Sequence, residues 1–276
     1  MKFLNCQKIQ HKVLRALYRL APFDLKGDLQ NRELISKPGL ISCLIVSNRP
    51  AQLEGLLSDL KAQDISKDSF ETIIISNEQV HLISDLRNAS ILRSKGEFLL
   101  FLDDDTRIYQ KDFLSKALVI FKSTDCDLLI PQANPLFGII RGRYEFLDRF
   151  SMANRCIFYR KSVIQELGGF MKGLAGYEDI ELSIRLMIKD PRILQEKGLN
   201  YYHPPLYFDS LRKPLAIGQS IFNMQRQYSL PVWLLAYFNG LRFLPLGLIP
   251  GDRFRQWFKI SLGILLYPFT GKSYYY

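Results

Sequence analysis

The stretch Phe98-Leu99-Leu100-Phe101-Leu102-Asp103-Asp104-Asp105 decides the fold class of this chain of 276 residues. A continuous apolar run of this length is typical of a strand buried on both faces of a sheet. Three adjacent carboxylates repel one another unless a positive charge lies among them, and a divalent cation accepts such hard oxygen ligands. Open α/β sheets bind their ligands at the carboxyl ends of the strands, where these aspartates fall. The alternative is a solvated acidic turn that caps the next helix.

Strand-like and helix-like segments alternate around this run with short connections. Further strands are predicted at 41–47, 71–76, 127–131, 152–159 and 199–202, and helices after Pro50, at 83–95, 111–122 and 161–167, and from Glu178. This order predicts an α/β fold with a doubly wound, mostly parallel sheet. Because right-handed crossovers bring the carboxyl ends of such strands to one edge, Asn48, Ser76 and the aspartates are expected to line a common crevice.

The charge distribution favours a membrane surface over nucleic acid as the partner. The net charge is +10, of which residues 1–26 carry +5 and residues 228–276 carry +4, so the body is nearly neutral. A nucleic-acid binder more often carries its basic residues across a face of the body. Basic and apolar ends are typical of attachment to an anionic bilayer.

Both ends of the chain have the pattern of membrane-associating extensions. Residues 8–20 predict a helix with Lys8, Lys12, Arg15 and Arg19 on one narrow face and apolar residues opposite. The apolar segments within 228–276 are too broken or too short for a helix of about 20 residues that spans a bilayer. We therefore predict a basic extension at 1–38, a body at 39–227 and a peripheral or monotopic tail at 228–276. Packing of both ends on the body is the alternative.

The four cysteines favour a reducing compartment. Cys6, Cys43, Cys126 and Cys156 show no paired or metal-type spacing, and no secretory signal is visible. Together with the basic ends, this predicts a protein at the cytoplasmic face of the membrane.

Six short motifs occur in the order in which one enzyme family has them. They are Asn48-Arg49-Pro50, Arg87-Asn88-Ala89, Gly96-Glu97-Phe98 leading into the aspartates, Gly168-Gly169-Phe170, Glu178-Asp179 with Leu182 and Arg185, and His203. Across residues 40–205 the chain resembles the inverting family-two glycosyltransferases, which have the GT-A fold. The resemblance implies transfer of a sugar from a nucleotide-diphosphate donor with Mn²⁺ or Mg²⁺ as cofactor.

The resemblance also implies roles for single residues. Asp105 is the expected metal ligand. Asp103 is expected to lie near the donor's ribose and to be a second ligand of the metal. His203 is expected to approach the metal or the diphosphate. Asp179 matches the catalytic base, and Glu178 lies beside it. The expected donor-binding residues are Asn48, Arg49, Arg87, Asp103 and Asp104. The family usually has an acidic residue at the end of the second strand that holds the nucleotide base. Here the strand ends at Ser76, so Asn77 or Glu78 is expected to replace it.

The remaining expectations concern the reaction. Direct, inverting displacement needs a carboxylate that takes the acceptor's proton. It also needs a cation that balances the negative charge of the leaving diphosphate. The Gln-x-x-Arg-Trp motif of processive members is missing, so transfer of a single sugar to a glycan or lipid-linked acceptor is expected, as in the synthesis of surface polysaccharides. Residues 170–177 are expected to form a flexible loop that closes over the donor. The alternatives are a non-catalytic nucleotide-sugar-binding protein and a sugar-phosphate nucleotidyltransferase, which would need a glycine-rich loop that 47–51 lacks.

Overall fold

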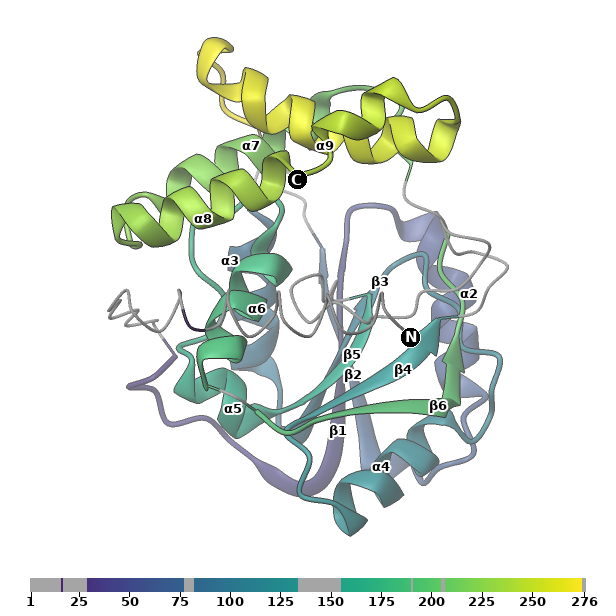
Figure 1. Ribbon diagram of the computed structural model, residues 1–276. Coiled ribbons are helices and arrows are strands. Elements are labelled where there is room, and N and C mark those ends of the chain that lie inside the picture. The colour runs from purple at the N-terminus through teal and green to yellow at the C-terminus, as the bar shows by residue number, and fades with distance from the viewer. Residues whose placement is uncertain are drawn as a thin grey trace.

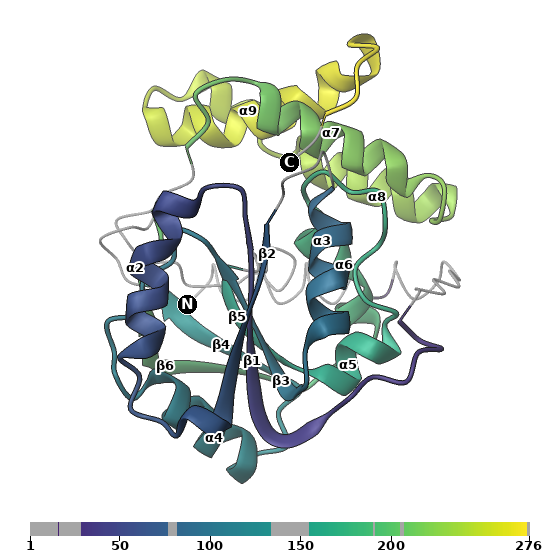
Figure 2. The same ribbon diagram turned by 180° about the vertical axis from the view of Figure 1, so that it is seen from behind.

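A six-stranded sheet with helices on both faces forms the body of the protein (Figures 1 and 2). The computed structural model describes residues 16, 29–76, 82–133, 155–189, 191–204 and 207–274. The strand order is β2-β1-β3-β5-β4-β6. The strands are β1 (Lys37–Ser47), β2 (Phe70–Ser76), β3 (Gly96–Asp103), β4 (Leu128–Ala133), β5 (Cys156–Arg160) and β6 (Ile193–Tyr201).

Most strand pairs are parallel, which confirms the predicted fold class. β1 runs parallel to β2 and β3, and β4 runs parallel to β6. β5 is antiparallel to both of its neighbours, β3 and β4, an orientation that the sequence did not predict. β6 also begins earlier than the predicted 199–202. It is an edge strand with one exposed face, and polar residues such as Glu196 and Lys197 therefore interrupt its apolar pattern.

Alternating side chains of the central strands build two separate apolar layers. Cys43 of β1 faces one layer and Leu44 the other, as the two-residue period of a strand requires. The helices of the first layer are α2 (Pro50–Lys61) and α4 (Phe113–Ser123). Those of the second are α3 (Ile83–Arg93), α5 (Lys161–Glu166) and α6 (Glu178–Lys189). The central strands are thereby held rigidly, which fixes the positions of their carboxyl ends.

The C-terminal helices form a further layer on the side to which β3 points (Figures 1 and 2). They are α7 (Arg212–Met224), α8 (Leu230–Leu241), η4 (Leu244–Leu248), α9 (Asp252–Leu266) and η5 (Tyr267–Phe269). Prolines in the first turns of α8 and η4 divide the apolar stretch into short helices. Among the described residues, none of the helices is both long and apolar enough to cross a membrane.

This C-terminal layer packs as a unit with the body rather than trailing from it. Ile221 of α7 shares an apolar cluster with Ile260 and Ile264 of α9, and Met224 shares another with Trp233 of α8 and Leu174 of the body. The expected boundary between residues 227 and 228 therefore falls inside a packed layer.

The structure describes three of the four cysteines and one residue of the predicted N-terminal helix. Cys43, Cys126 and Cys156 are buried free thiols, as expected for a reduced protein, whereas Cys6 lies outside the described residues. The predicted basic helix at 8–20 also lies outside them, apart from Ala16.

Candidate active site

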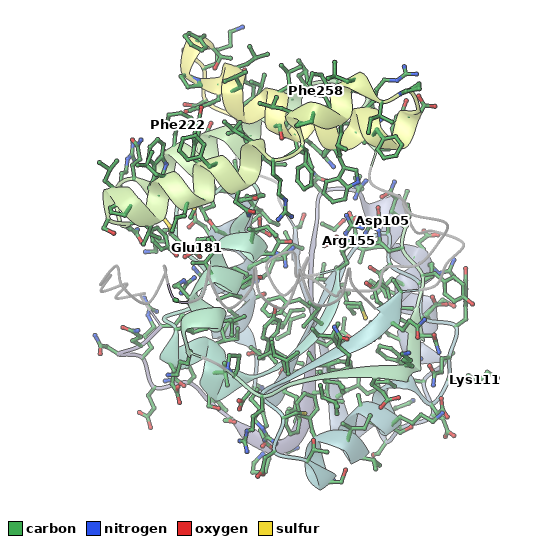
Figure 3. The ribbon with its side chains drawn as sticks, viewed as in Figure 1. Asp105, Lys111, Arg155, Glu181, Phe222 and Phe258 are labelled. Atoms are coloured by element: carbon green, nitrogen blue, oxygen red, sulfur yellow. The ribbon has the colours of Figure 1, made fainter. Side chains whose placement is uncertain are left out.

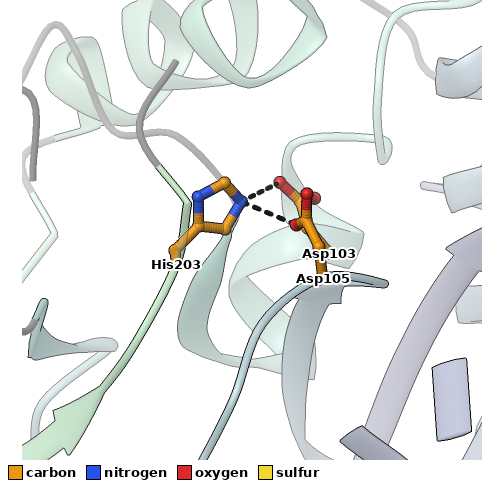
Figure 4. A group of neighbouring side chains, drawn as sticks. All are labelled: Asp103, Asp105 and His203. Atoms are coloured by element: carbon orange, nitrogen blue, oxygen red, sulfur yellow. Dashed lines mark ion pairs between the residues drawn. The ribbon is translucent and has the colours of Figure 1, made fainter. Parts of the chain in front are cut away.

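The aspartate triplet splits between two sides of the chain. Asp103 and Asp105 both face His203, whose Nε2 lies 3.3 Å from Asp103 Oδ2 and 3.0 Å from Asp105 Oδ1 (Figure 4). Asp104 points the other way, toward the end of β1. Asp104 and Asp105 lie in a turn that the N–H of Thr106 closes by donating to the carbonyl of Asp103 over 3.1 Å, and this turn sets the split. Two carboxylates and one imidazole thus converge.

A short bridge between distant segments brings His203 to this place. The N–H of Arg107 donates to the carbonyl of Tyr202 over 2.8 Å, and the N–H of Tyr202 donates back to Arg107 over 2.8 Å. The segment after β3 is thereby joined to the end of β6, although β5 and β4 lie between the two strands in the sheet. Asp105 and His203 each lie close to this bridge, and it holds them in position.

Unpaired polar atoms at this cluster fit a divalent cation. Asp105 Oδ1 and His203 Nε2 are buried and lack a hydrogen-bond partner among the described residues, although they are neighbours. Buried polar groups are rarely left in this way without a ligand. The Nδ1 of His203 lies 2.6 Å from the carbonyl of Pro204, which can only accept, so Nδ1 carries a proton and Nε2 can coordinate a cation once its own proton is lost. Asp103, Asp105 and His203 therefore form a candidate metal site.

The charges at the cluster favour ionised carboxylates. Without a cation, burial raises the pKa of Asp103, but the hydrogen bond and charge of a protonated His203 and the charge of Arg87 outweigh it and lower the pKa to about 2. The pKa of Asp105 is lowered as well, because the same imidazole outweighs the effect of burial. Both side chains are thus acceptor-only oxygen ligands at neutral pH.

Asp104 holds the turn between β1 and α2. Its side chain is 1% exposed and accepts from the hydroxyl of Ser47 over 2.7 Å and from Arg49 Nε over 3.2 Å, with a second, short contact from Arg49 Nη2. The guanidinium of Arg49 also lies 3.8 Å from Asp105. Asp104 therefore positions Arg49 at the metal cluster, while direct contact of Asp104 with a donor stays a prediction.

Arg87 links the metal cluster to the acid pair. Its Nε lies 3.0 Å from Glu178 Oε1, and its Nη2 lies 3.5 Å from Asp103 Oδ1. The guanidinium is largely buried beside the paired rings of Phe101 and Phe170, at 5.8 and 5.6 Å from their centroids. The structure thus places Arg87 as a shared counter-ion, and its predicted contact with the donor stays a prediction.

Glu178 and Asp179 occupy the first turn of α6, where the helix dipole favours negative charge. Glu178 is 4% exposed and faces Arg87, whereas Asp179 is partly exposed and its Oδ1 accepts from the N–H of Ile180 over 2.8 Å. Burial raises the pKa of Glu178 to about 7 against the pull of Arg87, and burial also raises the pKa of Asp179. The more exposed Asp179 is the one placed to meet a substrate.

The loop before this acid pair is anchored, contrary to the expectation of a flexible lid. Leu174 is fully buried, and its N–H donates to the hydroxyl of Ser84. The loop ends at Tyr177, which has a φ of 67°, the only non-glycine residue in the left-handed region among those described. Strain of this kind persists where the surroundings hold the backbone, and it is often found at functional sites.

The sequence reasoning did not identify the α7 residues that hold this loop. Ser220 Oγ accepts from the N–H groups of Ala175 and Gly176 over 2.9 and 3.2 Å, and Asn223 Nδ2 donates to Gly173 over 2.8 Å. Their positions at i and i+3 on an amphipathic helix are the available signal, but nothing local marks their partners.

A buried ion pair lies beneath the acid pair in α6. Glu181 and Arg185 form a bidentate bridge, with Nε to Oε1 at 2.7 Å, and Tyr228 donates a short hydrogen bond to Glu181. The i, i+4 spacing predicts the bridge, whereas Tyr228 comes from the C-terminal layer, beyond local reach. Figure 3 shows Glu181 at the junction of α6 with this layer, and Asp105 and Arg155 between the sheet and α9.

The remaining predicted donor-binding residues are only partly placed. Asn48 is exposed directly after β1, beside Arg49, at the edge where β3 ends. Asn77 and Glu78 lie outside the described residues, so their predicted contact with the base is untested. Ser76 pairs with Ser47 across β1 and β2, which confirms that the two strand ends meet at one edge.

Solved structures with the same architecture contain sugar-nucleotide complexes. A mannosyltransferase from Pyrobaculum calidifontis, in complex with GDP-Man and Mn²⁺, matches with a TM-score of 0.60 and 11% identity over 98% of this chain and 99% of that one. TarS residues 1–349 from S. aureus, in complex with UDP-GlcNAc, match with a TM-score of 0.55 and 15% identity over 83% of this chain and 81% of that one.

The chain has the GT-A glycosyltransferase fold. This confirms the fold that the motifs implied. A curated relative from Haemophilus influenzae, described as an uncharacterized glycosyltransferase, is 25% identical over 183 residues. That match covers 54% of this chain and 62% of the relative. No family model matches the chain.

Proposed function

We propose that this GT-A protein transfers a single sugar from a nucleotide-diphosphate donor to a hydroxyl of a glycan or lipid-linked acceptor, with inversion and with a divalent cation. The observation that carries the proposal is the convergence of Asp103, Asp105 and His203 at the carboxyl edge of the sheet. The matching mannosyltransferase and TarS complexes, which contain GDP-Man with Mn²⁺ and UDP-GlcNAc, support the class of donor.

Asp103, Asp105 and His203 would hold the cation, with Mn²⁺ favoured by the mixed oxygen and imidazole donors and Mg²⁺ as the alternative. When bound, such a cation balances the negative charge that develops on a leaving diphosphate. The protein helps to keep Asp103 ionised, because the positive charge of Arg87 lowers the pKa of its carboxyl. Arg49, held by Asp104 close to Asp105, adds a fixed positive charge for the donor's phosphates.

Asp179 is the proposed general base. It takes the proton of the acceptor hydroxyl as the hydroxyl oxygen bonds to the anomeric carbon, and the bond from that carbon to the diphosphate oxygen breaks. Attack from the face opposite the diphosphate inverts the anomeric centre and needs only this one carboxylate. Glu178 is buried and pairs with Arg87, so we assign it a role in positioning Arg87 and the start of α6.

The cytoplasmic membrane face is the proposed location. The basic and apolar ends of the chain support it, with net charges of +5 over residues 1–26 and +4 over residues 228–276. An acceptor that is lipid-linked, or a growing surface glycan, would be met there. Transfer of one sugar at a time rests on the missing motif of the processive enzymes.

The test incubates the protein with a panel of UDP-, GDP- and dTDP-sugars and measures the release of the nucleoside diphosphate. Wild type is expected to turn over at least one donor with Mn²⁺ and not after chelation, whereas Asp105→Asn and Asp179→Asn are expected to lose on the order of a hundredfold or more in rate. Donor binding without turnover by wild type would instead support the non-catalytic alternative. A product with the donor's own anomeric configuration would reject inversion.

A further inference from the structure

Large exposed hydrophobic side chains gather in the C-terminal layer. Seven of the thirteen among the described residues lie there: Leu230, Phe238, Leu248, Ile249, Leu265, Leu266 and Phe269. The other six come before α7 in the sequence. Single exposed apolar residues are ordinary, but a concentration of them on one layer marks an interaction surface.

The two most exposed of these residues are at the tips of turns. Leu248, at the end of η4, is 89% exposed, and Phe269, at the end of η5, is 83% exposed. η4 and η5 lie at opposite ends of α9 in the layer farthest from α4 (Figures 1 and 2). Leu265 and Leu266 are exposed near the second tip. Covering such exposed apolar side chains with an apolar medium lowers the free energy, because their surface is removed from water.

The charge of the same segment indicates which apolar medium covers these side chains. Residues 228–276 contain five Lys and Arg residues and a single acidic residue, Asp252, whose carboxylate lies 3.2 Å from Arg255. Arg242 and Lys272 are exposed and add positive charge. Basic residues beside exposed apolar side chains complement an anionic headgroup layer over hydrocarbon.

We propose that the outer surface of η4, α9 and η5 docks on an anionic lipid bilayer, with Leu248 and Phe269 inserted below the headgroups. This proposal rests on the proposed function in one respect only: docking would place the candidate site beside lipid-linked acceptors. The surface itself is independent of the chemistry. The occupant is a bilayer rather than a second protein chain because the apolar tips share their segment with the exposed cations Arg242 and Lys272 and with only one acidic residue, Asp252.

Co-sedimentation of the full chain with vesicles tests this docking. The vesicles contain phosphatidylcholine alone or with about 30 mol % phosphatidylglycerol, enough to give a negative surface potential. The test variant is Leu248→Ser with Phe269→Ser, and the matched control is Val119→Ser, which changes an exposed apolar residue of α4, 63% exposed, away from the surface. All three substituted side chains are largely exposed, so stability should change little.

Wild type and Val119→Ser are expected to bind the anionic vesicles, more weakly at high salt, and the double variant about tenfold or more weakly, because each buried CH₂ contributes to partitioning. Donor turnover in detergent-free buffer should be equal in all three proteins, which separates docking from the proposed chemistry. Equal vesicle binding by the double variant and wild type would overturn the proposal. So would a wild-type dimer in light scattering that the double variant converts to monomer, since the occupant would then be a second copy.

Discussion

Arg87 Nε lies 3.0 Å from Oε1 of Glu178 and thereby ties the helix before β3 to the start of the helix that carries the proposed base. Both ends of this ion pair are buried. Because Arg87 also reaches Asp103, one guanidinium contacts both the metal cluster and the acid pair. The two halves of the candidate site are therefore electrostatically coupled.

This coupling predicts the pH dependence of turnover. Burial raises the pKa of Glu178 to about 7 and raises that of Asp179, while the charge of Arg87 opposes both shifts. A general base acts only when ionised, so kcat should fall as the pH drops through the apparent pKa of the pair. Arg87→Gln removes the opposing charge and should move this acidic limb to higher pH, whereas Arg87→Lys should retain more of the wild-type limb. Superimposable profiles for wild type and Arg87→Gln would refute the coupling.

Ser220 is predicted to position the loop before the acid pair. Ser220→Ala leaves the N–H groups of Ala175 and Gly176 without their acceptor, so the segment leading to Glu178 should shift. We expect kcat to fall on the order of tenfold with little change in the donor KM, since misplaced groups slow chemistry more than binding. Ser261→Ala is the control, because Ser261 is also fully buried in the C-terminal layer but donates to Gly240 and not to the loop. The same loss of kcat in both variants would indicate general destabilisation instead.

Glu181 is predicted to be among the residues most important for stability. Glu181→Gln removes a fully buried charge and leaves Arg185 without its counter-ion, which costs about 3–5 kcal/mol of the free energy of unfolding. The exposed pair of Arg192 and Asp125 is the comparison, where Asp125→Asn should cost less than about 1 kcal/mol. Urea unfolding followed by circular dichroism measures both. Equal, small losses would mean that the buried bridge contributes no more than a surface pair.

The sequence predicted the fold and the participants of the site better than their arrangement. The apolar run before Asp103 and the alternation of segments were sufficient for the sheet, because their periods are local properties. The split of the triplet, with Asp104 facing Ser47, arises in the turn after β3, and the strand period that predicts the sheet does not extend to it.

Other features depend on contacts between distant segments. His203 reaches Asp105 only through the bridge between Arg107 and Tyr202, and this bridge joins segments that the sheet order separates. Ser220 lies within the predicted body, and only the packing of α7 beside the loop shows that Ser220 holds the segment before Glu178. Neither Ser220 nor Tyr177, with its left-handed backbone, has a sequence motif that marks it.

Mn²⁺ binding to the cluster of Asp103, Asp105 and His203 tests the central claim most directly. Electron paramagnetic resonance of free Mn²⁺, titrated with protein in the presence of UDP or GDP, counts bound ions without relying on turnover. We predict one bound Mn²⁺ per wild-type chain and an affinity tenfold or more weaker in Asp105→Asn and His203→Ala, as expected when a ligand is lost. The exposed-site variant Asp125→Asn should bind as wild type does. Unchanged affinity in both cluster variants, or no binding by wild type with either nucleotide, would contradict the account.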